Sequence, residues 1–100
     1  MAKSADYFIS KVRFNPAGTH IDKVIQHDVT DGNNFGNGYE RTRSQVIDNL
    51  KNGSVYCTIF DQNGWKLGSK VHHVKEYGKE YISTNPNETT KDNLDNLPTF

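Results

Sequence analysis

Turn sequences divide this chain into short segments, and all but one of these segments have the two-residue period of β-strands. One turn is Asn15-Pro16-Ala17-Gly18, where proline presets φ for a turn corner and glycine tolerates a positive φ. Asn63-Gly64 is the signal of a tight β-hairpin, and Tyr77-Gly78-Lys79 predicts a further turn. A chain of 100 residues has the usual length of one domain, and we expect a single domain over residues 1–100.

The segments on either side of the first turn predict a β-hairpin. In residues 7–14, the apolar residues of one parity are Phe8, Val12 and Phe14. In residues 21–29, the residues of one parity are Ile21, Ile25 and Val29, with Val24 on the other. This alternation is typical of strands that bury one face and expose the other to water.

The segment of helical period covers residues 42–52. Thr42 and Gln45 form a T-x-x-Q capping box, in which each side chain accepts a hydrogen bond from the backbone amide of the other residue. An apolar stripe follows on one side, made of Val46, Ile47 and Leu50. Gly53 is placed to end the helix in the left-handed conformation. Because so short a helix is marginal alone, we expect it to pack on a sheet.

Three more strands are expected after the helix. Residues 54–60 carry large groups on both parities, which is typical of a central strand covered on both faces. Residues 65–74 predict the next strand, with Gly68 as a candidate break, and residues 80–84 predict the last. Residues 30–41 hold Gly32, Gly36 and Gly38, and we expect this stretch to form neither helix nor strand.

The resulting order is β-β-α-β-β-β, and the short connections around the helix indicate an α+β domain. We expect a mostly antiparallel sheet of five strands, with a small, partly open barrel as the alternative form. Residues 85–100 form a polar tail in which Leu94 and Leu97 are three residues apart. We expect both leucines to dock on the sheet; the alternative is an exposed linear motif that binds a partner.

The charge balance and the cysteine content exclude several classes of protein. Twelve Lys and Arg match twelve Asp and Glu, so the basic excess typical of nucleic-acid coats and membrane-surface proteins is absent. No apolar run is long enough to span a membrane, and the first residues lack the apolar stretch of a signal peptide. Cys57 is the only cysteine, which excludes an internal disulfide and suits a reducing compartment. We therefore expect a cytoplasmic protein.

The residues of several segments together resemble a known family. They are Ile9 with Val12-Arg13, Ile21 with Val24, Thr42-Arg43 with Val46-Ile47, Gly53 with Tyr56 and Thr58, Gly78-Lys79 with Tyr81-Ile82 and Thr84, and Asp92-Asn93-Leu94 with Asn96-Leu97-Pro98. With these features the chain resembles the bacterial family catalogued as domain of unknown function 3892. The resemblance implies a small prokaryotic protein, or one from a phage or mobile element of such a host. It brings no activity, cofactor or catalytic residue.

A glycine-rich stretch before the helix is the first candidate site. Glycines let backbone amides approach an anion, a helix start offers free N–H groups, and arginine binds phosphate through two donors. The residues concerned are Gly32, Gly36, Gly38, Arg41 and Arg43. Their spacing matches neither the Walker pattern nor the dinucleotide-binding fingerprint. The alternative is that this stretch is a flexible crossover connection with no binding role.

Lysines next to aromatic residues form the second candidate site. Aromatic rings on a sheet can stack the bases of single-stranded nucleic acid, while lysines contact its phosphates. The residues concerned are Trp65, Lys66, Lys70, Lys75 and Lys79, with Tyr77 and Tyr81 nearby. The alternative is that these aromatic residues belong to the core, because the chain is poor in aliphatic residues.

We find no catalytic or metal-binding constellation in the sequence. The histidines are His20, His27, His72 and His73, and we interpret them as exposed strand residues. His72 and His73 are neighbours on one expected strand, so their side chains point to opposite faces and do not share an ion. Cys57 lies in mid-strand, where a buried small hydrophobic role is expected rather than a nucleophile.

These observations predict a non-enzymatic interaction module without a cofactor. We expect it to bind a protein partner through an exposed sheet edge, the glycine-rich stretch or the tail. An adaptor or inhibitor from a bacterium or its phage would fit the length and the neutral charge. The alternative is a nucleic-acid or nucleotide-binding protein that uses Arg41 and Arg43 or the lysine-rich strand.

Overall fold

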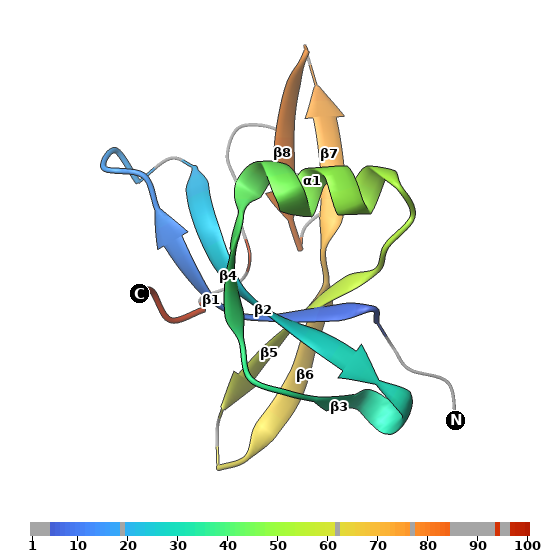
Figure 1. Ribbon diagram of the computed structural model, residues 1–100. Coiled ribbons are helices and arrows are strands. Elements are labelled where there is room, and N and C mark those ends of the chain that lie inside the picture. Colours follow the sequence, from blue (N-terminus) through green and yellow to red (C-terminus); the bar gives the residue numbers. More distant parts are fainter. Residues whose placement is uncertain (1–4, 19, 62, 77, 85–93, 95–96) are drawn as a thin grey trace.

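The computed structural model of the protein describes residues 5–18, 20–61, 63–76, 78–84, 94 and 97–100. Its fold is α+β, with strands as the main element and one α-helix (Figure 1). The strands are β1 (Tyr7–Phe14), β2 (Ile21–Thr30), β3 (Asn34–Phe35), β4 (Tyr39–Thr42), β5 (Tyr56–Asp61), β6 (Trp65–Lys70), β7 (His72–Glu76) and β8 (Lys79–Ser83). The helix α1 covers Arg43–Lys51, and a short 3-10 helix, η1, covers Asp31–Asn33.

The main sheet is a curled, open half-barrel, so the expected α+β class and barrel-like sheet are confirmed. Its strand order is β3-β2-β1-β5-β6, and β4 also pairs with β2, next to β3 along the same edge. Strand β1 is antiparallel to β2 but parallel to β5, with Phe8 opposite Cys57. The sheet is therefore mixed rather than purely antiparallel. Strands β7 and β8 form a separate two-stranded sheet.

The two faces of the main sheet belong to two different clusters of buried residues. Neighbouring residues of a strand point to opposite faces, and Ile9 and Tyr56 belong to the larger cluster while Phe8 and Cys57 belong to the smaller one. The larger cluster also contains Val46 and other residues from α1, β8 and the tail. Figure 1 shows α1 lying across one end of the sheet, with the β7–β8 hairpin beside it.

The helix forms as its sequence predicts. The hydroxyl of Thr42 accepts a hydrogen bond from the Gln45 amide at 3.2 Å, and the Thr42 amide donates to the Gln45 side chain at 2.9 Å. Val46 and Ile47 are buried against the sheet. Gly53 has a φ of +92°, a left-handed conformation that ends the helix.

Two expectations about element boundaries are wrong. Residues 30–41 contain η1, β3 and β4, because the backbone of this stretch pairs with the edge of β2, a stabilisation that local propensity does not report. The strand expected over 65–74 is divided at Val71 into β6 and β7. At the candidate break, Gly68, strand β6 continues, but its pairing with β5 shifts register. Val71 is buried in the larger cluster, and its amide donates to the carbonyl of Tyr56 at 2.8 Å. Beyond Val71 the chain pairs with β8 instead of β5.

The expected buried parity of the first hairpin also needs correction. Val24 is fully buried and Ile25 only partly, although Ile21 is buried as expected. Arg13 pairs with Lys23 and Phe14 with Ile21, so Asp22 in β2 has no partner residue in β1. Such a bulge adds one residue to the strand, and the residues on either side of it therefore face the core with opposite parity. Phe14, expected on the buried face of the first strand, lies at the end of β1 and is 39 % exposed.

The described part of the tail lies against β1. Leu94 and Leu97 are buried in the larger cluster. The amide of Val12 donates to the carbonyl of Pro98 at 3.0 Å, and the amide of Phe100 donates to the carbonyl of Val12 at 3.2 Å. Figure 1 shows the C-terminus beside β1. The expectation for residues 85–93, 95 and 96 lies outside the described residues.

Candidate functional site

The edge strand β6 carries the most exposed large apolar side chains of the described chain. Trp65 is 52 % exposed and Leu67 is 48 % exposed. They are two residues apart, so both side chains project from the same face of the sheet, the face of the smaller buried cluster. Within the described ranges β6 pairs only with β5, and its other side is a free edge. Such edges accept an additional strand readily.

A contact between aromatic rings shows how far the sheet curls. The rings of Phe35 in β3 and Trp65 in β6 meet edge to face, with their centroids 5.5 Å apart. These two strands lie at opposite ends of the strand order, so the edges of the half-barrel approach each other at this point. A small cavity of about 130 Å³ remains beside the contact. We call it the barrel opening; its apolar lining is Phe8, Phe35, Ile59, Trp65 and Leu67.

Buried His27 holds one wall of the barrel opening in place. Its Nδ1 donates to the carbonyl of Gly36 at 2.8 Å, since a carbonyl oxygen can only accept, and its Nε2 lies 2.7 Å from the hydroxyl of Ser10. The ring of His27 also packs edge to face on Phe35, with centroids 5.2 Å apart. The expectation of an exposed histidine is therefore wrong for His27, which is 7 % exposed. No motif of the sequence indicates Phe35 as a site residue; its one signal is a large apolar residue between glycines.

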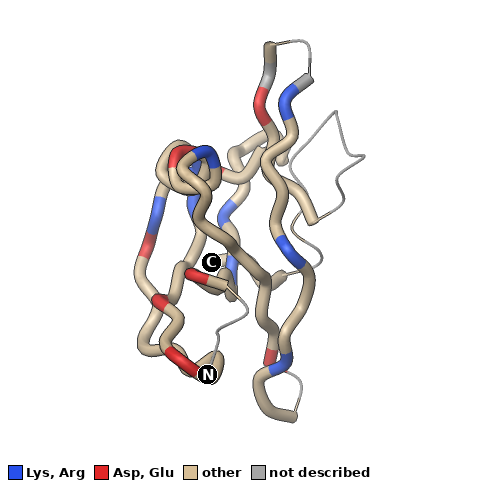
Figure 2. The backbone as a smooth tube through the Cα atoms, turned by 90° about the vertical axis from the view of Figure 1, so that its right-hand side faces the viewer, with Lys and Arg blue, Asp and Glu red and all other residues tan. Residues whose placement is uncertain are grey.

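The lysines of the second candidate site follow β6 and β7. Lys66, Lys70 and Lys75 are exposed, and Figure 2 shows blue positions spaced along these two strands on one side of the molecule. The expected aromatic neighbours are not exposed with them: Tyr81 is 6 % exposed and stacks on His20, with ring centroids 6.0 Å apart. Tyr77 and the side chain of Lys79 lie outside the described part of the structure. Among the described residues of this surface, Trp65 is therefore the exposed aromatic residue.

The two arginines of the first candidate site have different neighbours. The guanidinium of Arg41 lies over the ring of Tyr39, 4.5 Å from its centroid. Arg43 instead donates to the backbone carbonyl of Glu80 in the β7–β8 hairpin. Arg41 therefore contacts a neighbour within β4, whereas Arg43 joins α1 to the second sheet.

The glycines of the same candidate site have structural contacts of their own. Gly32 lies in η1 with a φ of +76°, and the carbonyl of Gly36 accepts the His27 hydrogen bond. A side chain at Gly38 would overlap Ile25 and approach Cε1 of His27 to 2.8 Å. Gly38 therefore allows the chain to run close to β2.

The only cysteine of the chain is buried, as the sequence predicts. Cys57 is 7 % exposed and belongs to the smaller cluster. Burial raises the pKa of its thiol, while the charge of Lys70 acts in the opposite direction. A raised pKa lowers the fraction of the reactive thiolate at neutral pH.

Two features are absent from the residues that the structure describes. Among them, no three His, Cys, Asp or Glu side chains are grouped so that they could hold a metal ion. No helix within the described ranges has the length and apolar character needed to cross a membrane.

Comparison with known proteins identifies the family of the chain. No curated protein and no solved structure matches it. A family model does match residues 8–98, a range that begins in β1, contains α1 and the barrel opening, and ends beside the buried Leu97. The resemblance expected from the sequence is therefore confirmed, and the chain belongs to the family described as Protein of unknown function (DUF3892).

Proposed function

We propose that the protein is an interaction module that binds an acidic, extended segment of a partner protein at the barrel opening. The observation that carries this proposal is the exposure of Trp65 and Leu67 beside a cavity between two strand edges. Water-exposed apolar groups around a concave site are typical of protein interaction surfaces. The cavity of about 130 Å³ has room for one apolar side chain of the partner as an anchor.

The charge of the edge strand supports an acidic partner. Lys66 and Lys70 are exposed, and β6 contains no carboxylate that would balance them. A second copy of β6 would bring lysines against lysines, whereas Asp or Glu side chains beside an apolar anchor would complement the strand. Charge complementarity therefore supports a foreign acidic segment over self-association.

The backbone of β6 supports an extended segment. Among the described strands, the outer edge of β6 has no neighbour, which leaves one row of amides and carbonyls for strand addition. A register shift between Cys57 and Ile59 interrupts the ladder where Gly68 passes Thr58 closely, and the Ser69 amide donates to the Thr58 hydroxyl at 3.0 Å. Such bulges limit indiscriminate edge pairing. We expect a partner strand to pair before the bulge, next to Trp65 and Leu67.

Within this proposal the protein acts without catalysis, as an adaptor or inhibitor in the cytoplasm of a bacterium, encoded by that bacterium or its phage. Support comes from the resemblance of its sequence to a bacterial family, from its zero net charge and from its single cysteine. A protein surface also accounts better for Leu67, an aliphatic residue, than a base-stacking platform with one exposed ring would.

A peptide-display selection on the immobilised protein tests the proposal. We expect it to enrich peptides with several Asp or Glu residues around one large apolar residue. Trp65 is the only tryptophan of the chain, so its fluorescence should change saturably when a selected peptide is added. Lys66→Glu with Lys70→Glu should weaken that binding at least about tenfold, and the effect should shrink at high salt.

Matched variants decide the outcome. Lys11 is exposed on β1, away from the barrel opening, and Lys11→Glu should bind the selected peptide as the unmodified protein does. The proposal is wrong if selection enriches no common pattern, or if the charge-reversed and control variants bind equally. Saturable quenching of Trp65 by single-stranded DNA, with a steep salt dependence, would assign the surface to nucleic acid instead.

A further inference from the structure

The opposite face of the sheet carries a polar groove that the proposed function does not use. One wall is formed by α1 and the residue that follows it, where four polar residues at helical spacing form a stripe: Gln45, Asp48, Asn49 and Asn52. Residues spaced by three, four and seven positions share one side of a helix. The apolar stripe of the same helix packs into the core, so this second, polar stripe is free to line the groove.

The floor of the groove is held by buried hydrogen bonds. The hydroxyl of Tyr56, which is fully buried, donates to the side-chain carbonyl of Gln26 at 2.6 Å and accepts from the amide of Asn49 at 2.9 Å. Gln26 is 1 % exposed, and its amide donates to the hydroxyl of Tyr39 at 3.1 Å. Tyr39 in turn donates to the carboxylate of Asp28. This chain fixes the polar groups of helix and sheet in one arrangement before any ligand arrives.

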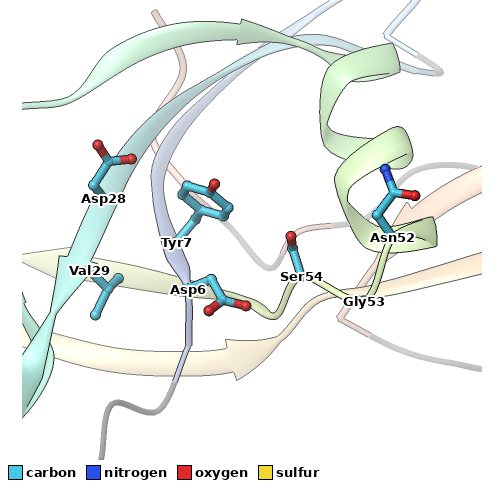
Figure 3. Close-up of a pocket in the computed structure, with 7 residues that line it drawn as sticks. All are labelled: Asp6, Tyr7, Asp28, Val29, Asn52, Gly53 and Ser54. Carbon is cyan, nitrogen blue, oxygen red and sulfur yellow. The ribbon is translucent and has the colours of Figure 1, made fainter.

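Tyr7 lines two neighbouring hollows of the groove. One hollow, of about 450 Å³, lies between β1, β2 and the end of α1, and Figure 3 shows Tyr7 among Asp6, Asp28 and Ser54. The other, of about 370 Å³, continues past Tyr7 to Tyr39 and Arg41. The ring of Tyr7 packs against Tyr56, with centroids 5.0 Å apart, which holds it as a partly exposed flat surface in the middle of the groove.

The lining of the groove selects among classes of ligand. Its charged groups are one arginine and three aspartates, so a phosphate or another anion would meet repulsion. An apolar ligand would displace water from exposed polar side chains of the lining, such as Asp48, without replacing the hydrogen bonds of that water. Besides Val29 and Gly53, the remaining groups are carboxamides, a serine hydroxyl and tyrosine side chains, which can both donate and accept hydrogen bonds.

We propose that this groove binds a neutral oligosaccharide. Sugar hydroxyls both donate and accept, and they would pair with the stripe of α1 on one side and with Asp28 on the other. The C–H face of a pyranose ring would lie on the ring of Tyr7, because aromatic faces bind such weakly polarised C–H groups. Two hollows on either side of Tyr7 give room for more than one sugar unit.

Nuclear magnetic resonance tests this proposal with trisaccharides of glucose and of N-acetylglucosamine, in α- and β-linked forms. At millimolar concentration we expect at least one of them to shift the side-chain amide signals of Gln45, Asn49 and Asn52 saturably. Asp48→Ala with Asn52→Ala should weaken the binding by about tenfold or more, which corresponds to the loss of one or two hydrogen bonds. Ser44→Ala, an exposed position of the same helix outside the lining, should leave it unchanged.

The outcome is independent of the barrel opening. Trp65→Ala with Leu67→Ala should bind the sugar as the unmodified protein does, so failure of one proposal does not imply failure of the other. The inference is overturned if none of the trisaccharides causes saturable shifts, or if the groove variant responds as strongly as the unmodified protein. A stronger response to glucose 6-phosphate than to the neutral sugars would also overturn it, because it would assign the groove to an anion.

Discussion

The two faces of the half-barrel differ in how they are covered. On one face, α1, the β7–β8 hairpin and the tail pack over the larger cluster, and Ile9, Tyr56 and Ile82 are fully buried there. On the other face, the smaller cluster is covered by the curl of the sheet itself, and Trp65 and Leu67 remain about half exposed. The chain thus places its helix and its second sheet on the same side.

Because of this difference, we expect the side chains of the covered face to determine stability and the exposed side chains of the other face to serve interaction. Full burial of a large apolar side chain stabilises a fold by about 1.5–3 kcal/mol, so the covered face contributes most of the apolar stabilisation. The exposed side chains of β6 contribute little in the free protein but have area to bury against a partner. The following substitutions test whether the two faces differ in this way.

The largest contrast is expected between two leucines. Leu94 is 2 % exposed on the covered face, and Leu94→Ala should lower the free energy of unfolding by about 2–5 kcal/mol through a lost contact and a cavity. Leu67 is 48 % exposed, and Leu67→Ala should change it by about 0.5 kcal/mol or less. Chemical denaturation measures both. Equal effects would mean that the tail is not part of the core, and that the two faces do not differ as described.

The next contrast concerns the segment between β3, which carries Phe35, and β4. Gly38→Ala should destabilise the protein by about 1–3 kcal/mol, because the new methyl group would overlap Ile25 in β2. Gly36→Ala is the control, since nothing lies within 4 Å of the new methyl group. Similar melting temperatures for both variants would contradict the close approach of this segment to β2.

A smaller effect is expected at the start of the covering helix. Thr42→Ala removes the hydroxyl that accepts the Gln45 amide and should cost about 1 kcal/mol. Thr42→Ser keeps an acceptor and should restore most of the stability. An unchanged midpoint of denaturation in Thr42→Ala would show that the Thr42 hydroxyl does not stabilise the start of the helix.

The smallest effect is expected where α1 meets the second sheet. Lys51, by its hydrogen bond, and His73 lower the pKa of Glu80 below its ordinary value of 4.5. Because the pKa is lower in the folded chain, the stabilisation is present above the ordinary pKa and is lost as the pH falls through the lowered one. Glu80→Gln should therefore flatten the acid limb of the stability profile. An identical acid limb in Glu80→Gln would show that these contacts do not stabilise the hairpin.

Local signals in the sequence predict the elements whose stabilising contacts are close in the chain. The capping box of Thr42, the positive φ of Gly53 and the Asn63-Gly64 turn depend on neighbouring residues, and each has the expected conformation, with φ values of +56° and +117° in the turn. The burial of Cys57 on a strand covered on both faces also follows from alternation in the sequence.

Contacts between distant residues explain what the sequence could not predict. Strands β3 and β4 form because the edge of β2 offers backbone partners, although the glycines of this stretch disfavour a strand. The parallel pairing of β1 with β5, and the burial of His27 beneath Phe35, likewise depend on how the sheet curls. The barrel opening joins residues from four strands, so no local motif could have indicated it.

The double variant Trp65→Ala with Leu67→Ala tests most directly whether the exposed face serves interaction rather than folding. Its melting temperature and its affinity for a peptide selected on the unmodified protein are measured side by side. We predict a melting temperature close to that of the unmodified protein and a loss of peptide binding by about a hundredfold, as expected when central aromatic and aliphatic contacts are removed. A variant that unfolds, or one that binds the peptide as tightly as before, would contradict the division of the sheet into a stabilising and a binding face.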